Sequence, residues 1–169
     1  MKIIETDRLI LCRLTTDDAA FILKLVNDAM FLRHIGDRGV KTLDDARKYI
    51  LNGPVDSYER FGFGLYLTKL KDGDIPIGIC GLLKRDSLED VDVGFAFLPE
   101  YRRKGYAYES ASAVLDHGKT ILGLNRIIAV TSPDNNRSIK ILKKIGLTYR
   151  EMIKLTPDEE ECKLFGIDF

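Results

Sequence analysis

The chain has 169 residues, and its 26 basic side chains equal its 26 acidic ones, so its formal net charge is zero. This balance disfavours a protein that coats nucleic acid. Hydrophobic residues make up 45% and charged residues 31%, which excludes collagen-like, low-complexity and mostly disordered chains. A chain of this length can bury a sizeable core, and we expect a single domain over residues 1–169.

The cysteines and the first residues indicate the compartment. Cys12, Cys80 and Cys162 are odd in number, far apart and free of any CxxC pairing, which predicts neither a disulfide framework nor a zinc site. We interpret them as buried thiols in a reducing compartment. Residues 1–8 become charged too early for a signal peptide, and no apolar run approaches the ~20 residues that span a bilayer. We therefore expect a cytoplasmic protein that uses no metal and contacts no membrane.

The first half of the chain predicts strands and helices in alternation. A strand over 8–14 is followed by polar residues 15–18 that suit a helix start, and apolar residues from 21 to 29 then recur at helical spacing. Thr42, with Asp45 three residues later, opens a short helix that Gly53-Pro54 should end. Two β-rich runs, 63–70 and 75–83, flank the turn residues 71–74 and predict an antiparallel hairpin.

The second half predicts a parallel crossover unit. In a strand over 91–98, large apolar side chains alternate with small ones and with Asp92, so the second face could leave room for a ligand. A helix from Gly105 to about Leu122 and a strand over 126–131 complete a βαβ step. A short helix over 136–144 and a closing hairpin, 147–154 with 161–167, follow. The expected fold is a mixed α/β (α+β), mostly antiparallel sheet of about seven strands with one parallel step and about four helices.

The turn between that strand and its helix has the composition of an anion site. Three cations, Arg102, Arg103 and Lys104, precede Gly105 at the opening of the helix. Free N–H groups and the positive end of the helix dipole attract phosphate, Gly105 permits close approach of the backbone, and the small Ala107 keeps the first turn clear. A solvated basic turn is the alternative interpretation.

Several motifs resemble one enzyme family. The pattern Arg102-x-x-Gly105-x-Ala107 after a strand resembles the pyrophosphate-binding motif of the GCN5-related N-acetyltransferases (GNAT). Residues 136–147 resemble the second signature of that family, an Asn-x-Ser helix ending in Lys-x-Gly-Phe. The segments 6–13 and 106–109 resemble the RimJ/RimL-type branch, whose best-known members acetylate protein amino termini. The resemblance covers essentially the whole chain.

This resemblance implies a set of cofactor contacts. In relatives the backbone at the end of the strand pairs with the pantetheine arm of coenzyme A, and the following turn holds the pyrophosphate. Carried over residue by residue, the implied cofactor-binding residues are Phe97, Leu98, Arg102, Arg103, Lys104, Gly105, Tyr106, Ala107 and Asn136.

Two further residues are candidates for catalysis. Many family members place a tyrosine four residues after the serine of the second signature to protonate the departing thiolate, but Leu142 stands there, so we assign that role to Ser138. Asp92 is the candidate base, at a position where RimJ-like relatives often carry a glutamate. Each residue also has a structural alternative. Ser138 could satisfy a backbone group at the start of a helix, and Asp92 could lie on a solvated face of the sheet.

The sequence therefore predicts an acetyl-CoA-dependent N-acetyltransferase that acts on a primary amine. A protein or peptide amino terminus is the expected acceptor, and a small amine is the other; monomer and homodimer both stay open. The alternative is a coenzyme-A-binding sensor or interaction module without catalysis, for which Leu142 is the reason. Residues 113–120 fit a permissive Walker A pattern but fall inside a predicted helix, and His34 and His117 lack a motif partner.

Overall fold

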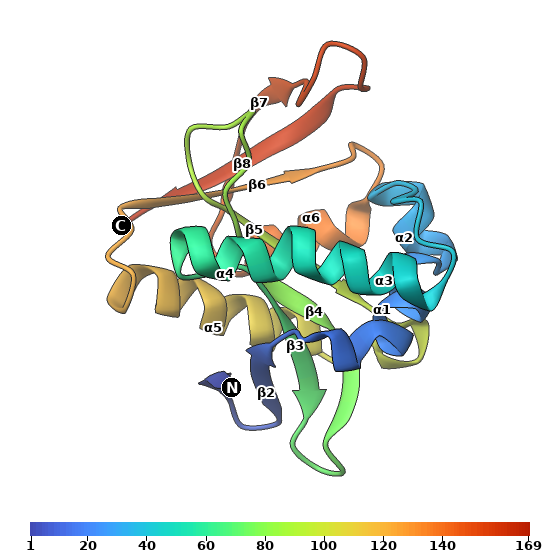
Figure 1. The fold of residues 1–169 in the computed structure, drawn as a ribbon. Coiled ribbons are helices and arrows are strands. Elements are labelled where there is room, and N and C mark those ends of the chain that lie inside the picture. The colour runs from blue at the N-terminus through green and yellow to red at the C-terminus, as the bar shows by residue number, and fades with distance from the viewer.

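One mixed sheet of eight strands forms the centre of the protein, and helices cover both of its faces (Figure 1). The computed structural model describes all 169 residues. The strands are β1 (Lys2–Glu5), β2 (Leu9–Arg13), β3 (Leu65–Leu70), β4 (Ile75–Leu83), β5 (Asp92–Phe97), β6 (Arg126–Thr131), β7 (Thr148–Ile153) and β8 (Cys162–Asp168), in the spatial order β1-β2-β3-β4-β5-β6-β8-β7. Only β5 and β6 are parallel. The predicted mixed sheet with one parallel step is confirmed, and β1 is a strand that the sequence analysis missed.

Short polar side chains cap three of the six helices. The six are α1 (Ala19–Val26), α2 (Ala29–His34), α3 (Leu43–Ile50), α4 (Asp56–Phe61), α5 (Tyr106–Thr120) and α6 (Asn136–Lys144). Thr42 and Asp45 form the predicted capping box of α3. The Walker-like residues 113–120 lie inside α5, as predicted, so they form no phosphate loop. None of the helices combines the length and the apolar character that crossing a membrane requires.

The predicted stop at Gly53-Pro54 is wrong. A π-helical turn over Leu51–Val55 joins α3 to α4, and Figure 1 shows them as one continuous helix. Pro54 has no N–H to donate and its ring does not fit a regular α-helical turn, so the wider turn accommodates it without breaking the helix. The helix ends instead at Gly62, whose positive φ of 79° forms a left-handed C-cap.

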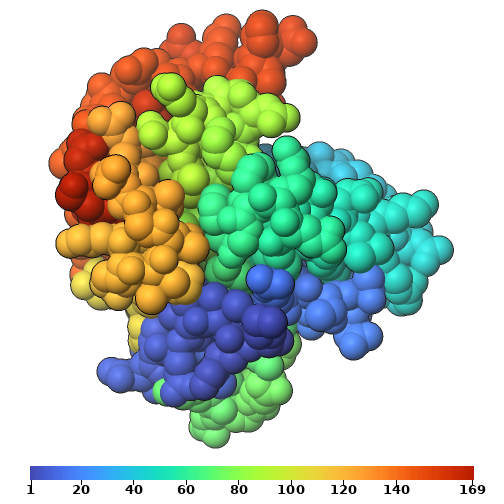
Figure 2. Space-filling view, turned by 60° about the vertical axis from the view of Figure 1, so that its left-hand side comes forward, coloured from blue at the N-terminus to red at the C-terminus, as the bar shows by residue number.

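Two hydrophobic cores lie on opposite faces of the sheet. Successive strand residues point to opposite faces, so Val93 and Phe97 of β5 pack with Val114 of α5 and Leu142 of α6 in one core. Residues of α1, α3 and α2 form the other core together with Leu98. In Figure 2 the N-terminal strands and the C-terminal hairpin lie at opposite ends of the molecule, as the strand order requires.

The three cysteines are free and lie in different environments. Cys80 is buried, whereas Cys12 and Cys162 are half-buried, so the expectation of three buried thiols holds for one of them. Burial raises the pKa of Cys80 to about 12, which keeps this thiol protonated and unreactive. No three His, Cys, Asp or Glu side chains come together in a group that could hold a metal ion.

Candidate active site

A cavity of about 830 Å³ opens where β5 and β6 separate, and it connects the two faces of the sheet. We call its two parts the α5 side and the α3 side. The α5 side is lined by Phe95, Phe97, residues 101–103 and 105–108, and most of α6. The α3 side is lined by residues of α2 and by Arg38, Tyr49, Leu65, Ile79, Leu83, Arg85, Asp92, Gly94 and Ala96.

The opening exists because β5 and β6 pair only at their beginnings. Their ladder contains the single pair Asp92–Ile128, supported by a hydrogen bond of 3.0 Å from the Ile128 N–H to the Val91 carbonyl. In the register between β4 and β5, the even-numbered residues of β5 bond to β4. The N–H and C=O groups of Phe95 and Phe97 therefore point toward β6 and have no strand partner there.

The backbone of Leu98, by contrast, is already paired within the protein. This corrects the expectation that its backbone pairs with the pantetheine arm. Its N–H donates to the carbonyl of Ile77 at 3.0 Å, and its carbonyl accepts from the N–H of Tyr101 at 3.0 Å. Its side chain is buried in the core on the other face of the sheet. Phe95 lies two residues before Phe97, and its backbone faces β6 in the same way. It was not among the residues predicted from the sequence.

The turn from Arg102 to Ala107 presents unpaired backbone donors to the cavity. Gly105 adopts a left-handed conformation (φ 84°) just before α5, and no side chain caps the helix there. Because the first N–H groups of a helix have no partner within it, this end of α5 attracts an anion. Arg102 and Arg103 line the cavity beside it, whereas Lys104 does not.

A brace from the N-terminal segment fixes the outer side of this turn. The Arg8 guanidinium donates to the Lys104 carbonyl at 3.1 Å, contacts the Glu109 carboxylate at 2.7 Å and lies over the Tyr106 ring at 4.4 Å. Burial disfavours the charged form of Glu109, but hydrogen bonds from Thr6 and Arg8 lower its pKa overall. The segment 6–13 thus contributes to the site by holding the turn in place.

Arg102 connects the turn to α2. Its guanidinium forms an ion pair with Asp28 at 2.5 Å, and the two side chains are 18% and 10% exposed. Asp28 also caps α2 by accepting from the N–H groups of Met30 and Phe31. The predicted continuous helix over this region is therefore broken into α1 and α2, because Asp28 starts a second helix that covers the cavity.

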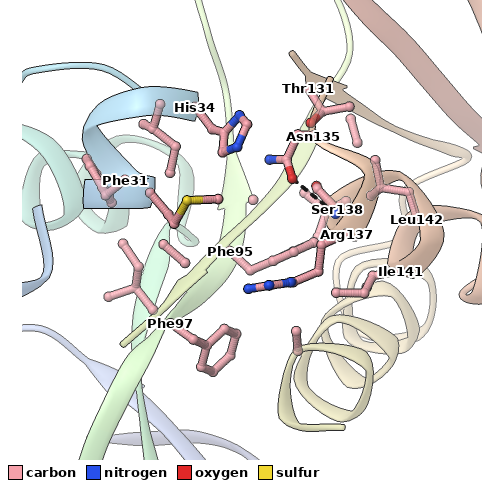
Figure 3. A pocket seen from close by; sticks show the side chains of 18 of the residues that line it. Phe31, His34, Phe95, Phe97, Thr131, Asn135, Arg137, Ser138, Ile141 and Leu142 are labelled. Carbon is pink, nitrogen blue, oxygen red and sulfur yellow. Dashed lines mark hydrogen bonds between the residues drawn. The ribbon is translucent and has the colours of Figure 1, made fainter. Parts of the chain in front are cut away.

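The other end of α2 reaches the loop between β6 and α6. His34 lies on the cavity wall with its Nδ1 2.9 Å from the Ser132 hydroxyl, and Arg33 pairs with Asp134 at 3.1 Å. Figure 3 shows His34 on one side of the cavity and Asn135, Ser138 and Leu142 on the other. Sequence motifs could not reveal His34, because its partners lie about a hundred residues away.

Ser138 and Asn136 both line the cavity at the start of α6. The helix is capped by the Asn135 carboxamide oxygen, which accepts from the Ser138 N–H at 3.3 Å (Figure 3). The Ser138 hydroxyl makes no hydrogen bond within the protein, so the capping role considered for it belongs to Asn135. Leu142 faces the same cavity with 1% of its surface exposed.

Asp92 is the buried acid of the cavity. It is 1% exposed, and the Arg85 Nε lies 3.1 Å and 3.3 Å from its two carboxylate oxygens. Burial raises its pKa to about 6, and the positive charge of Arg85 partly opposes that rise. The solvated-face alternative is therefore wrong for this residue, although Asp92 does lie on the predicted face of β5.

The exposed loops of the chain contribute unequally to the cavity. Residues 30–38 supply much of the wall on the α3 side, and the 84–90 loop supplies Arg85. Residues 154–160 supply nothing. That loop follows β7, and β8 separates β7 from the opening beside β6.

Comparisons with known proteins agree with this geometry. Residues 8–148 match the family model of the acetyltransferase (GNAT) domain. The uncharacterized N-acetyltransferase YnaD of Bacillus subtilis (strain 168) is 32% identical over 144 residues, which are 85% of this chain and 81% of YnaD. A GNAT-family acetyltransferase structure from Bacillus anthracis is 25% identical and covers 99% of this chain and 98% of its own, with a TM-score of 0.81.

A second structure shares the fold at lower identity. RimL, described as a ribosomal L7/L12 alpha-N-protein acetyltransferase in complex with coenzyme A, is 15% identical with a TM-score of 0.85, covering 99% of this chain and 98% of its own. The matched domain model spans both the turn before α5 and the α6 signature. The chain belongs to the GNAT family of N-acetyltransferases.

Proposed function

We propose that this enzyme transfers the acetyl group of acetyl-CoA to a primary amine, either the amino terminus of a protein or peptide or a small amine. One observation carries the proposal: a single cavity contains unpaired strand backbone, an uncapped helix start and a buried carboxylate. Together these can hold an extended phosphorylated thioester and accept a proton from an attacking amine.

The residues on the α5 side fit coenzyme A. The free N–H and C=O groups of Phe95 and Phe97 can pair with an extended amide-containing arm, and the turn before α5 can bind a pyrophosphate. Arg103 and Asn136 line the same side and add polar contacts. When bound, acetyl-CoA supplies the activated acetyl group as a thioester. The chain's own groups orient it in the cavity.

Asp92 acts as the base in this proposal. Its raised pKa of about 6 leaves it ionised at neutral pH, yet basic enough to accept a proton from the amine directly or through water. An α-amino group titrates at about 7.7–8.0 and a lysine at about 10.4, so an amino-terminal acceptor needs only a modest base. Arg85 holds the carboxylate in one orientation.

Ser138 assists the departing sulfur. Its hydroxyl has no partner in the protein and lines the cavity, while Leu142 has no proton to donate. A serine hydroxyl is a weak acid, so Ser138 stabilises the thiolate by a hydrogen bond, and solvent then delivers the proton.

The acceptor class is supported by two kinds of evidence. RimL, which shares the fold, is described as acting on the amino terminus of a ribosomal protein. The cavity is also open to solvent beside the exposed loop around Arg38, so the end of a peptide can enter it. A small amine is the second candidate because it fits the same space.

A catalytically silent coenzyme-A-binding module is the competing function, and Leu142 in place of the tyrosine that many family members carry favours it. Thiol release from acetyl-CoA with a panel of amines, with mass spectrometry of the acceptors, separates the two. Acetylated amine supports the transferase. Tight binding of acetyl-CoA by calorimetry without turnover of any peptide or small amine supports the silent module.

A further inference from the structure

We infer that the acceptor carries a carboxylate close to its amine, bound by Arg38 and Arg85 beside Tyr49 on the α3 side of the cavity. This inference rests on the proposed transferase function and specifies its substrate class. The three side chains come from a loop, from α3 and from the segment after β4; all line the cavity, and Arg85 contacts Asp92.

Arg38 is the unpaired cation of this wall. It is exposed in the loop between α2 and α3 and has no carboxylate within ion-pair distance. The neighbouring Asp37 pairs with Lys41 at 3.4 Å instead, and Arg33 is paired with Asp134. A guanidinium with five donors and no protein partner is suited to a planar carboxylate.

Arg85 is only partly used by the protein. Its Nε contacts both oxygens of Asp92, but its two terminal nitrogens make no hydrogen bond within the protein. The side chain is 32% exposed, so those nitrogens remain accessible. The Nε of Arg85 therefore orients Asp92, and the two terminal nitrogens are available to a ligand.

Tyr49 lines the same side of the cavity as the two arginines and is within electrostatic reach of both. Burial raises the pKa of its hydroxyl, and the positive charges of both Arg38 and Arg85 oppose that rise. The hydroxyl makes no hydrogen bond within the protein. Three unpaired donor groups thus line the α3 side of the cavity.

The charge balance of the cavity argues against a polycationic acceptor. Eight Arg and Lys side chains line it, against two carboxylates, Asp92 and Asp134. Both carboxylates are already paired with arginines, and Asp86 and Glu89 of the neighbouring loop do not reach the cavity. Even when coenzyme A takes up the cations on the α5 side, Arg38 and Arg85 keep the α3 side positive.

Two sources could provide this chemistry: a free amino acid, or a peptide with an acidic residue beside its amino terminus. The test uses acetyl-CoA thiol release with free glutamate, with spermidine, and with three peptides that differ only in Glu, Gln or Lys at the second position. We expect kcat/KM to be at least tenfold higher for the glutamate-containing acceptor than for its glutamine match, and lowest for spermidine. If free glutamate is turned over and the Glu peptide is not, the source is a free amino acid; the reverse result identifies a peptide. Either result supports the inference.

Arg38→Gln should reduce the Glu-over-Gln preference about tenfold, and Tyr49→Phe should reduce it less. Arg47→Gln is the matched control, because Arg47 lies on α3, pairs with Asp44 and does not line the cavity. A preference for spermidine or the Lys peptide, or an Arg38→Gln variant with unchanged preference, overturns the inference and leaves the transferase function intact. Bound acetyl-CoA with no turnover of any acceptor overturns both.

Discussion

The two sides of the cavity are built in different ways. On the α5 side the ligand-facing groups are mostly backbone: the edge of β5 and the turn before α5, where Arg103 and Gly105 have positive φ. On the α3 side they are side chains, such as Arg38, Tyr49 and Asp92, from segments far apart in sequence. A backbone site requires a particular local conformation and so constrains consecutive residues, whereas a side-chain site constrains only where each residue lies after folding.

The two sides are also held differently. The turn before α5 is supported from outside by Arg8, which is 47% exposed. On the α3 side, by contrast, Arg85 holds a carboxylate that is 1% exposed. Exposed ion pairs change stability little, whereas a buried charge is costly and its protonation is therefore sensitive to its surroundings. We expect the stronger dependence of function on pH to come from the α3 side.

The largest effect is expected from the base on the α3 side. Asp92→Asn should lower turnover at least a hundredfold and leave coenzyme A affinity nearly unchanged, because a positioned base typically contributes about 10²–10⁴ in rate. In the unmodified enzyme kcat/KM should rise with pH as Asp92 loses its proton near pH 6. The variant should lack that rise. Equal pH profiles for the two proteins would show that Asp92 is not the base.

The same residue should link stability to pH. The pKa of Asp92 is about 6 in the folded protein against an ordinary value of 3.8, so between these values the folded state holds more protons and stability falls as pH rises. The stability of Asp92→Asn relative to the unmodified protein should therefore increase by roughly 2 kcal/mol between pH 4 and pH 7. Urea denaturation at both pH values measures this.

Asp168→Asn is the control of opposite sign. Hydrogen bonds from Arg126 and Arg150 lower the pKa of that exposed carboxylate, so its contribution to stability is present at neutral pH and lost in acid. The Asp168 variant should therefore lose relative stability as pH rises. The same pH trend in both variants would contradict the assignment.

The contrast between the two sides explains what the sequence could predict. The turn before α5 was predictable because Arg102, Gly105 and Ala107 lie close together in sequence, and their charge, backbone freedom and small size each meet a requirement of an anion site. The fold was likewise predictable from alternation in β5 and from helix caps such as Thr42. His34 and Arg85 had no local signature, because their roles arise only from packing between distant segments.

The errors arise where the conformation depends on packing or on strand register and not on the local sequence alone. Pro54 is a reliable helix stop in an α-helix but not in a π-helical turn, which depends on packing along the whole segment. Leu98 was assigned from its position at the end of the strand, whereas the direction of its N–H depends on the register with β4. Neither the register nor the turn type can be obtained from residue identity alone.

A matched pair of glycines tests whether the α5 side depends on its backbone conformation. Gly105 and Gly73 have nearly equal φ values of 84° and 85°, but Gly73 lies in the turn between β3 and β4, away from the cavity. Valine at either position should cost about 1–3 kcal/mol of backbone strain. Only Gly105→Val should lower coenzyme A affinity, by tenfold or more in calorimetry. Equal affinities in the two variants would contradict the proposed pyrophosphate site.

The smallest effect is expected at Ser138, near the opening where the two sides of the cavity meet. Because Asn135 caps α6 and the Ser138 hydroxyl has no partner, Ser138→Ala should change the free energy of unfolding by less than about 0.5 kcal/mol. Loss of one hydrogen bond to the leaving sulfur should lower kcat about tenfold without changing coenzyme A affinity. Ser112→Ala is the control, since Ser112 lies on α5 outside the cavity. If the Ser138 and Ser112 variants have equal kcat, the departing thiolate takes its proton from solvent without help from α6, and acceptance of the amine proton by Asp92 remains the only acid–base step assigned to a side chain.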